Sequence, residues 1–194
     1  MILPIVAYGT PVLRTVAKEI TPDYPNLEKL LADMWETLYA SSGVGLAAPQ
    51  INKGIRLFIV DSMQLFANKE EEDDDKVKYP DEPGFRKVFI NAKIKEVDGK
   101  PWTYNEGCLS IPKIREDVER PETVTIEYDD ENFKHHVDTF NGITARIIQH
   151  EYDHIEGKLF IDYLKPFRKK LLQGKLADIT KGKVSVDYKM SFPK

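Results

Sequence analysis

Apolar residues recur at helical spacing in three stretches of the chain. In the first they occupy positions 27, 30, 31, 34 and 38, a pattern typical of an amphipathic helix packed against a core. In the second they occupy positions 143, 147, 148 and 155, between Gly142 and Gly157, glycines that favour helix boundaries. In the third, Pro166 begins a basic stretch with leucines at 171, 172 and 176. Each stretch predicts a helix, and the third is expected to end near residue 179.

Runs of alternating or continuous apolar residues predict strands over 56–60, 88–94, 123–128, 135–140 and 184–190. A short acidic connection at 129–132 joins two of these strands as a hairpin. Helices and strands mixed in this order predict an α+β fold. We expect mostly antiparallel strands around a central helix between Gly142 and Gly157, with a further helix near the C-terminus.

The stretch from Gly43 to Gln50 contains two glycines and one proline directly after the first predicted helix. These residues predict a loop, and glycines allow a backbone to approach a ligand closely. The Gln50 amide offers two N–H donors that could face a developing oxyanion. A plain turn before the next strand is the alternative interpretation.

Six consecutive acids, at positions 70–75, interrupt the apolar pattern. Such a run repels itself and cannot be buried, so residues 68–85 are predicted to form an acidic surface insertion. The length of 194 residues suits a single domain with a sizeable core. The predicted domain spans 1–194, with a terminal extension over 180–194.

Composition excludes several classes of protein. The net charge of −4 gives no global sign of a nucleic acid or an anionic membrane as a partner. Cys108 is the single cysteine, which rules out an internal disulfide framework. Residues 1–8 lack the features of a signal peptide, and no run reaches the ~20 apolar residues of a membrane helix. We therefore expect a cytoplasmic protein whose partners include no membrane and no DNA.

The predicted central helix carries the motif H-E-x-x-H, with His150, Glu151 and His154. Residues four apart lie on one helical face, so both imidazoles can reach one cation. Glu151 follows the first histidine and can sit beside the metal without binding it. This arrangement is typical of a hydrolytic metal site in which the carboxylate handles protons. Two histidines on a solvated helix face are the alternative.

A catalytic zinc-like ion usually takes three protein ligands and one water, so a third ligand is required. No Glu and no His follows Glu156, which leaves Cys108, His135 and His136 as candidates. His135 and His136 are adjacent in a predicted strand, so their side chains point to opposite faces. The Cys108 thiolate is a strong ligand for soft and borderline metals, and we favour it. A lone cysteine is otherwise most often a small buried hydrophobe.

Three segments together resemble the peptide deformylase family: 43–50 (GVGLAAPQ), 106–112 (EGCLSIP) and 149–154 (QHEYDH). They stand in the family's order and span most of the chain. The resemblance implies a hydrolase that removes the formyl group from the N-terminal formyl-methionine of newly synthesised proteins and releases formate. It also implies Fe²⁺, which Zn²⁺, Ni²⁺ or Co²⁺ can replace, bound by Cys108, His150 and His154. The sequence is closest to the first bacterial class, from which the insertion and the terminal extension depart.

The resemblance extends to the residues around the ion. Glu151 would take a proton from water and return it to the leaving amine, while Gln50 and the Leu109 backbone N–H would hold the oxyanion. Val44 and Gly45 would line the substrate groove. Glu106 and Arg115 would hydrogen-bond around the site or contact the substrate backbone, although a surface ion pair is equally compatible with Arg115. On the helical face of the two histidines, Ile143 and Ile147 are placed to wall an apolar pocket for the methionine side chain.

Two other functions remain compatible with H-E-x-x-H. A zinc-type metallopeptidase would share the motif and hydrolyse internal amides. A metal-stabilised binding module would need a fourth protein ligand, for which the sequence offers no good candidate.

The C-terminal region is strongly basic. From Lys165 to Lys194 the chain carries nine Lys and Arg residues against two Asp. Such asymmetry can mark an anionic partner, and the resemblance suggests docking of this region on the ribosome surface. A solvated basic face is the alternative.

Overall fold

The computed structural model describes residues 1–67 and 84–193. Five strands form an antiparallel sheet in the order β2-β3-β4-β7-β8. Two further strands, β5 and β6, pair as an antiparallel hairpin, and β1 pairs in parallel with β9. The strands are β1 Ile5–Val6, β2 Gly45–Ala47, β3 Leu57–Asp61, β4 Arg86–Asp98, β5 Trp102–Cys108, β6 Ile111–Arg120, β7 Thr123–Asp129, β8 His135–Asn141 and β9 Met190–Ser191.

The described helices agree with the three predicted ones and add one short helix after β3. They are α1 Leu27–Ala40, α2 Met63–Ala67, α3 Gly142–Ile155 and α4 Pro166–Thr180. Short 3-10 helices cover Pro11–Arg14, Ala48–Ile51 and Phe160–Tyr163. None of the helices in the described ranges is both long enough and apolar enough to cross a membrane.

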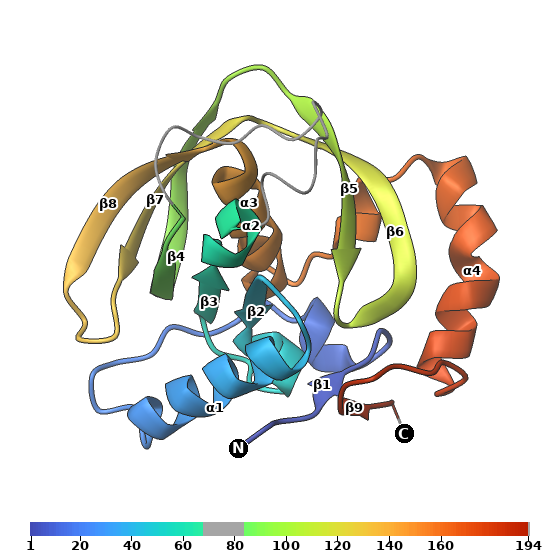
Figure 1. Ribbon diagram of the computed structural model, residues 1–194, viewed down its shortest axis with the longest axis horizontal. Coiled ribbons are helices and arrows are strands. Elements are labelled where there is room, and N and C mark those ends of the chain that lie inside the picture. The colour runs from blue at the N-terminus through green and yellow to red at the C-terminus, as the bar shows by residue number, and fades with distance from the viewer. Residues whose placement is uncertain (68–83, 194) are drawn as a thin grey trace.

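Helix α3 lies at the centre of the molecule, between the five-stranded sheet and the β5–β6 hairpin (Figure 1). It starts at Gly142, whose φ of 56° follows the extended Asn141. On its sheet side, Ala145, Ile147 and Ile148 pack in one core cluster with Phe58 and Phe89. On its other side, polar side chains reach the hairpin. The α+β fold with antiparallel strands around a central helix is therefore confirmed.

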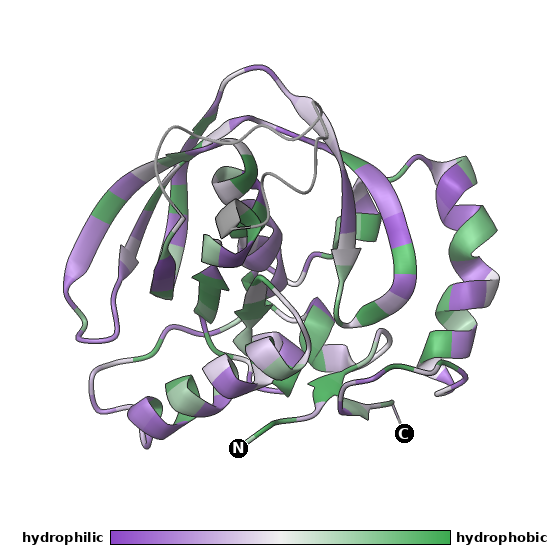
Figure 2. Cartoon of the chain, in the orientation of Figure 1, coloured by the Kyte–Doolittle hydropathy of each residue, from purple (hydrophilic) through white to green (hydrophobic). Residues whose placement is uncertain are grey.

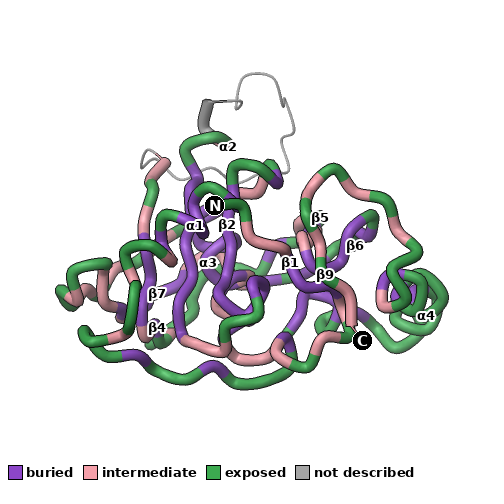
Figure 3. Tube along the Cα trace, turned by 90° about the horizontal axis from the view of Figure 1, so that it is seen from below, coloured by how far each residue is buried: buried purple, intermediate pink, exposed green. Residues whose placement is uncertain are grey.

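The other two helices cover outer faces. Helix α1 buries Met34 and Leu38 against the start of the sheet, as its apolar spacing predicts. Helix α4 buries Leu172, Leu176 and Ile179 against the β6 side of the core. Its remaining surface is exposed, and hydrophilic and hydrophobic residues alternate along it (Figures 2 and 3).

Several sequence predictions need correction. The stretch 43–50 is not only a loop, because residues 45–47 pair with β3 and the following residues form a 3-10 helix. The strand predicted over 88–94 is longer, since β4 continues past two register shifts to Asp98. The β5–β6 hairpin was not predicted at all. Strand β6 alternates buried and exposed positions, but two of its buried positions hold the charged residues Glu116 and Arg120, which hide the apolar pattern.

The predicted strand over 184–190 is wrong, because only Met190–Ser191 form a strand there. The alternation in this stretch has another cause. Val184, Val186 and Tyr188 are half-buried against the body of the protein, whereas Asp187 and its alternate neighbours are exposed. An extended segment covered on one side gives the same period of two as a sheet strand. The predicted insertion at 68–85 falls outside the described residues, except for Gly84 and Phe85.

Candidate metal centre

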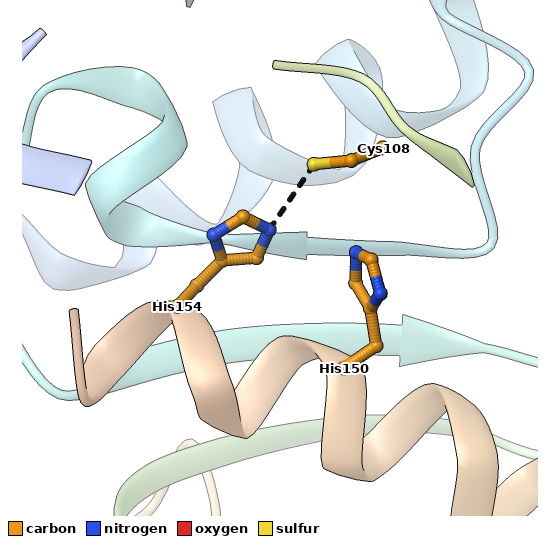
Figure 4. Close-up of side chains that lie close together, drawn as sticks. All are labelled: Cys108, His150 and His154. Carbon is orange, nitrogen blue, oxygen red and sulfur yellow. Dashed lines mark hydrogen bonds between the residues drawn. The ribbon is translucent and has the colours of Figure 1, made fainter. Parts of the chain in front are cut away.

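Three potential ligand atoms converge between α3 and the end of β5. His150 and His154 project from α3, and Cys108 projects toward them from the end of β5 (Figure 4). The Cys108 Sγ lies 3.3 Å from His154 Nε2. One ligating atom from each of the three residues lies within 4.8 Å of the others. In the described parts of the chain, this is the one group of three or more His, Cys, Asp or Glu residues close enough to hold an ion.

The position of Cys108 follows from the hairpin geometry. Cys108 ends β5 and pairs with Ile111, after a register shift at Gly107. The two residues between them, Leu109 and Ser110, form the turn. At Gly107, a Cβ atom would lie 3.0 Å from Nη1 of Arg115, so a larger residue would displace that side chain. The glycine thus leaves room for the Arg115 side chain to lie across β5.

Glu106 orients His150 from the side opposite the ligand cluster. Its Oε2 lies 2.9 Å from His150 Nδ1, a contact in which the ring nitrogen donates when it carries the proton. This leaves His150 Nε2 to face the cluster, as in the carboxylate–histidine pairs that fix metal-binding imidazoles. Arg120 and Arg146 also donate to the Glu106 carboxylate, at 2.7 Å and 2.8 Å. Burial alone would raise the pKa of Glu106, but its His150 and Arg120 partners hold that pKa far below its usual range.

Burial and neighbouring charges also shift the two histidines in opposite directions. Burial lowers the pKa of His150, but Cys108 and Glu106 outweigh it, so the net pKa is well above its usual range. Burial and the charge of His150 lower the pKa of His154 well below its usual range. An ion binds the neutral form of each imidazole, so on binding it would displace the proton that Cys108 and Glu106 favour on His150.

Glu151 is buried beside the cluster and is not one of the three converging residues. Its carboxyl group packs directly on Gly45, where a Cβ atom would lie 2.5 Å from Glu151 Oε1. Burial raises its pKa to about 7. Glu151 Oε2 has no hydrogen-bond partner among residues 1–67 and 84–193. Glu151 is thus a carboxylate whose proton affinity suits general acid–base chemistry near neutral pH.

A cavity of about 620 Å³ opens over these side chains. Cys108, Leu109, His150 and Glu151 line this cavity. All the residues predicted to contact substrate line it as well: Val44, Gly45, Glu106, Arg115, Ile143 and Ile147. Arg115 donates to the side chain and the backbone carbonyl of Asn105. These partners are neutral, so the contacts are not the surface ion pair considered as an alternative for Arg115. Additional walls come from α2 and from the C-terminal segment, neither of which was predicted to reach the site.

Gln50 is buried behind Cys108. Its Oε1 accepts the Ala47 N–H at 2.9 Å. Its Nε2 is directed at Cys108 Sγ, 3.5 Å away, and at Ser110 Oγ, 3.4 Å away. To donate to an oxyanion in the cavity, the Gln50 Nε2 would have to give up its contact with Cys108 Sγ or with Ser110 Oγ.

The other candidate ligands lie elsewhere. His135 and His136 belong to β8, the last strand of the five-stranded sheet. Their ring nitrogens contact Asp129 and Asp130, at 3.1 Å and 2.8 Å. They are residues of an edge hairpin, as the sequence predicted.

Sequence reasoning missed the buried arginines that support Glu106. Arg146 lies one turn before His150 on α3, and it also donates to the backbone carbonyls of Val118 and Trp102. Arg120 bridges Glu106 and Asp153, the latter at 2.7 Å. The sequence does contain a signal for Arg146, because it lies among the apolar residues of the predicted central helix. A buried arginine requires a partner, and this predicts a buried acidic or carbonyl group beside it.

The residues present fit a divalent cation. Two imidazoles and a thiolate suit borderline metals such as Fe²⁺ and Zn²⁺. Beside them, Glu151 Oε2 is buried without a hydrogen-bond partner in the described ranges. Unsatisfied buried polar atoms are rare in native proteins and often mark a functional site. Cys108, His150 and His154 therefore offer a donor set and a spacing that suit a divalent cation.

An α3 helix with H-E-x-x-H that faces a cysteine beneath an open cavity defines a metallohydrolase. The family model described as "Polypeptide deformylase" matches residues 2–170. The chain belongs to the peptide deformylase family.

Relatives and solved structures agree with this assignment. A peptide deformylase of Christiangramia forsetii is 54% identical over 193 residues, which cover 100% of this chain and 97% of the relative. One from Cytophaga hutchinsonii is 49% identical over 100% of this chain and 98% of the relative. The crystal structure of Plasmodium falciparum peptide deformylase has a TM-score of 0.76 at 35% identity, covering 92% of this chain and 95% of that one. A structure from Legionella pneumophila has a TM-score of 0.76 at 32% identity, covering 94% and 98%.

Family membership establishes the general activity. The protein is a metal-dependent hydrolase that removes the formyl group from the N-terminal formyl-methionine of newly synthesised proteins, with release of formate. Formylated nascent peptides are its substrates.

Proposed function

We propose that Cys108, His150 and His154 bind the catalytic ion and that Glu151 is the proton-transfer group. The observation that carries this proposal is the buried Glu151 carboxyl, with one unpartnered oxygen, beside the Cys–His–His cluster beneath the cavity. When bound, the divalent cation supplies a Lewis acid that lowers the pKa of water and polarises a carbonyl.

The chain's own residues then account for the remaining steps. Glu151 Oε2 accepts a proton from the attacking water and returns it to the leaving amine. The Leu109 backbone N–H and the Gln50 amide donate to the developing oxyanion, Gln50 after it exchanges one of its two contacts. Ile143 and Ile147, on the cavity wall, contact the methionine side chain of the substrate.

Four residues of the cavity wall have supporting roles in this proposal. Val44 and Gly45 line the groove for the extended substrate, and the absence of a side chain at Gly45 leaves room for Glu151. Arg115 contacts the substrate backbone from β6. Glu106, predicted from the sequence as a substrate contact, has its carboxylate engaged by His150, Arg120 and Arg146. We therefore assign Glu106 to orienting His150.

A peptide assay tests this function against the zinc-type metallopeptidase. Formate release is measured from a formyl-Met peptide, and internal cleavage is measured with the same peptide lacking the formyl group. We expect formate release with an intact peptide chain. Cleavage of the unformylated peptide at an internal bond would favour the metallopeptidase.

The choice of ligands predicts the metal content of Cys108→Ala. Without the thiolate, two imidazoles remain, and we expect loss of most of the bound metal because three protein ligands usually form such a site. Metal per chain is measured on anaerobically purified protein. His135→Ala and His136→Ala serve as matched controls that should keep their metal. Normal metal content in Cys108→Ala, with loss in either control, would contradict the ligand set.

We propose Fe²⁺ as the native ion, because the donor set accepts several divalent metals and the resemblance to peptide deformylases selects iron. A thiolate-bound ferrous ion with an open position is open to oxidation of the iron and of the sulfur. Activity of the protein purified anaerobically should therefore decay in air and persist after substitution with Ni²⁺. Time courses of formate release in air provide the measurement, and equal decay of both forms would argue against iron.

We also propose that the enzyme works in the cytoplasm and docks on the ribosome surface through α4. The helix exposes Lys169, Lys170 and Lys175. It also leaves two large apolar side chains exposed, Phe167 at 73% and Leu171 at 55%. A basic surface with apolar contacts suits ribosomal RNA and protein together. Phosphate contacts would make this docking dependent on salt.

Reversing the charge of Lys169, Lys170 and Lys175 to glutamate should weaken co-sedimentation with ribosomes. Turnover of short formyl-Met peptides should be unchanged, because these side chains lie outside the cavity wall. A matched variant reverses three exposed lysines remote from α4, namely Lys95, Lys100 and Lys134. If both variants bind ribosomes like the wild type, and a few-fold rise in salt has no effect, the docking proposal fails.

A further inference from the structure

The C-terminal segment after α4 returns to the active site. Strand β9 pairs in parallel with β1, and the backbone N–H groups of Ile5 and Ala7 donate to Lys189 and Ser191, at 2.9 Å and 2.8 Å. This pairing anchors the segment next to the cavity, where Val186 and Tyr188 form part of the wall. The family model ends at residue 170, so this part of the cavity lies beyond the matched region.

Tyr188 makes a specific polar contact from this segment. Its hydroxyl donates to the backbone carbonyl of Leu109 at 2.8 Å. Its half-buried ring packs, as Leu109 does, against the core cluster that contains Met34 and Leu46. The ring is therefore held from one side, and the hydroxyl meets the turn that directly follows Cys108.

That turn is restrained by segments far apart in the sequence. The Tyr8 N–H donates to the Ser110 carbonyl at 2.8 Å, and Gln50 Nε2 donates to Ser110 Oγ at 3.4 Å. Both contacts act on Ser110. At Leu109, the Tyr188 hydroxyl donates to the backbone carbonyl, and this contact holds the peptide plane that follows the residue.

We propose that Tyr188 is a positioning residue for deformylation, which holds Leu109 so that its backbone N–H points into the cavity beside Cys108. The inference rests on the proposed role of Leu109 as an oxyanion donor. The Leu109 carbonyl lies in a two-residue turn after a register shift, so a rotation of its peptide plane would disturb the preceding N–H. Displacement of about 1 Å at a reacting group can cost roughly 10²-fold in rate.

The test is Tyr188→Phe, which removes the hydroxyl and keeps the ring in its core contacts. We expect kcat for a formyl-Met peptide to fall about tenfold, less than the ~10²–10³ that removal of an oxyanion donor costs. KM and the metal content per chain should stay near the wild-type values, because neither the groove nor the ligands change.

Tyr39→Phe is the matched control. It removes a tyrosine hydroxyl that donates to Asp61 at 2.8 Å, and Tyr39 is not among the cavity-lining residues of the described chain. Its kcat should match the wild type, and thermal unfolding of both variants reports the general cost of losing a hydroxyl.

Three results would overturn the inference: Tyr188→Phe with wild-type kcat, equal loss of kcat in both variants, or loss of metal from Tyr188→Phe. The last would mean that the contact supports Cys108 and not Leu109. Failure of the proposed role of Leu109 is distinguished by an amide-to-ester replacement of the Cys108–Leu109 peptide bond, which removes the Leu109 N–H. A wild-type kcat in that protein would show that Leu109 is not an oxyanion donor, whatever the result for Tyr188→Phe.

Discussion

Replacing Glu151 with alanine or glutamine is expected to abolish nearly all formate release while the metal stays bound. The carboxyl is buried beside the Cys–His–His cluster and is not one of the three converging ligands. Its pKa of about 7, raised by burial, suits a group that accepts and returns a proton near neutral pH. Positioned acid–base groups contribute roughly 10²–10⁴-fold to rate, so kcat should fall by at least that range.

The two substitutions separate chemistry from packing. Glu151→Gln keeps the contact with Gly45 and loses the ionisable group, whereas Glu151→Ala also leaves a space against the backbone. Equal losses of kcat in both variants would show that proton transfer is the missing function. Metal per chain is measured alongside turnover, with the exposed Glu119→Gln as a control. A variant with normal metal content and near-wild-type kcat would contradict the role of Glu151.

The helices of this protein could be predicted because their apolar spacing reports local burial. In α1 the buried residues follow the period of 3.6 that the sequence displays. In α3 the isoleucines keep a helical spacing, although polar residues such as Arg146 and Glu151 are buried as well. The β7–β8 hairpin was predicted for the same reason, since its strands alternate about a short acidic turn. The H-E-x-x-H pair depends only on helical geometry, which brings His150 and His154 to one face wherever the helix lies.

The parts of the site that could not be predicted depend on contacts between segments far apart in the sequence. Glu106 was recognised as a polar residue near Cys108, but its partners Arg120, Arg146 and His150 come from 14 to 44 positions away. Their convergence requires β5, β6 and α3 to be assembled first. The contribution of Tyr188 to the cavity depends on the parallel β1–β9 pair, which joins the two ends of the chain. Neither arrangement leaves a local period in the sequence.

Glu106→Gln should produce the largest loss of stability among single substitutions at this site. The glutamine keeps the shape of the side chain, but Arg120 and Arg146 lose the carboxylate that balances their buried charges. Removal of one partner from a buried ion pair typically costs about 3–5 kcal/mol. Metal affinity should also fall, by roughly 10–100-fold, because the partner that orients a ligating histidine is weakened.

Denaturant unfolding of the metal-free protein separates the first effect from the second, and its pH dependence gives a further check. The folded-state pKa of Glu106 lies below its ordinary value of 4.5, so its contribution to stability is fully present above that pH. The contribution is lost as pH falls toward the folded-state pKa. The difference in unfolding free energy between wild type and Glu106→Gln should therefore be largest near pH 7 and shrink below about pH 4.5.

Glu127→Gln is the control for this experiment, because Glu127 pairs with the exposed Lys95 at 3.2 Å and such surface pairs contribute only about 0–1 kcal/mol. If Glu106→Gln unfolds at the same denaturant concentration as this control, the buried carboxylate does not hold the two arginines in place. In that event the orientation of His150 must come from α3 itself, and metal affinity in Glu106→Gln should then equal that of the wild type.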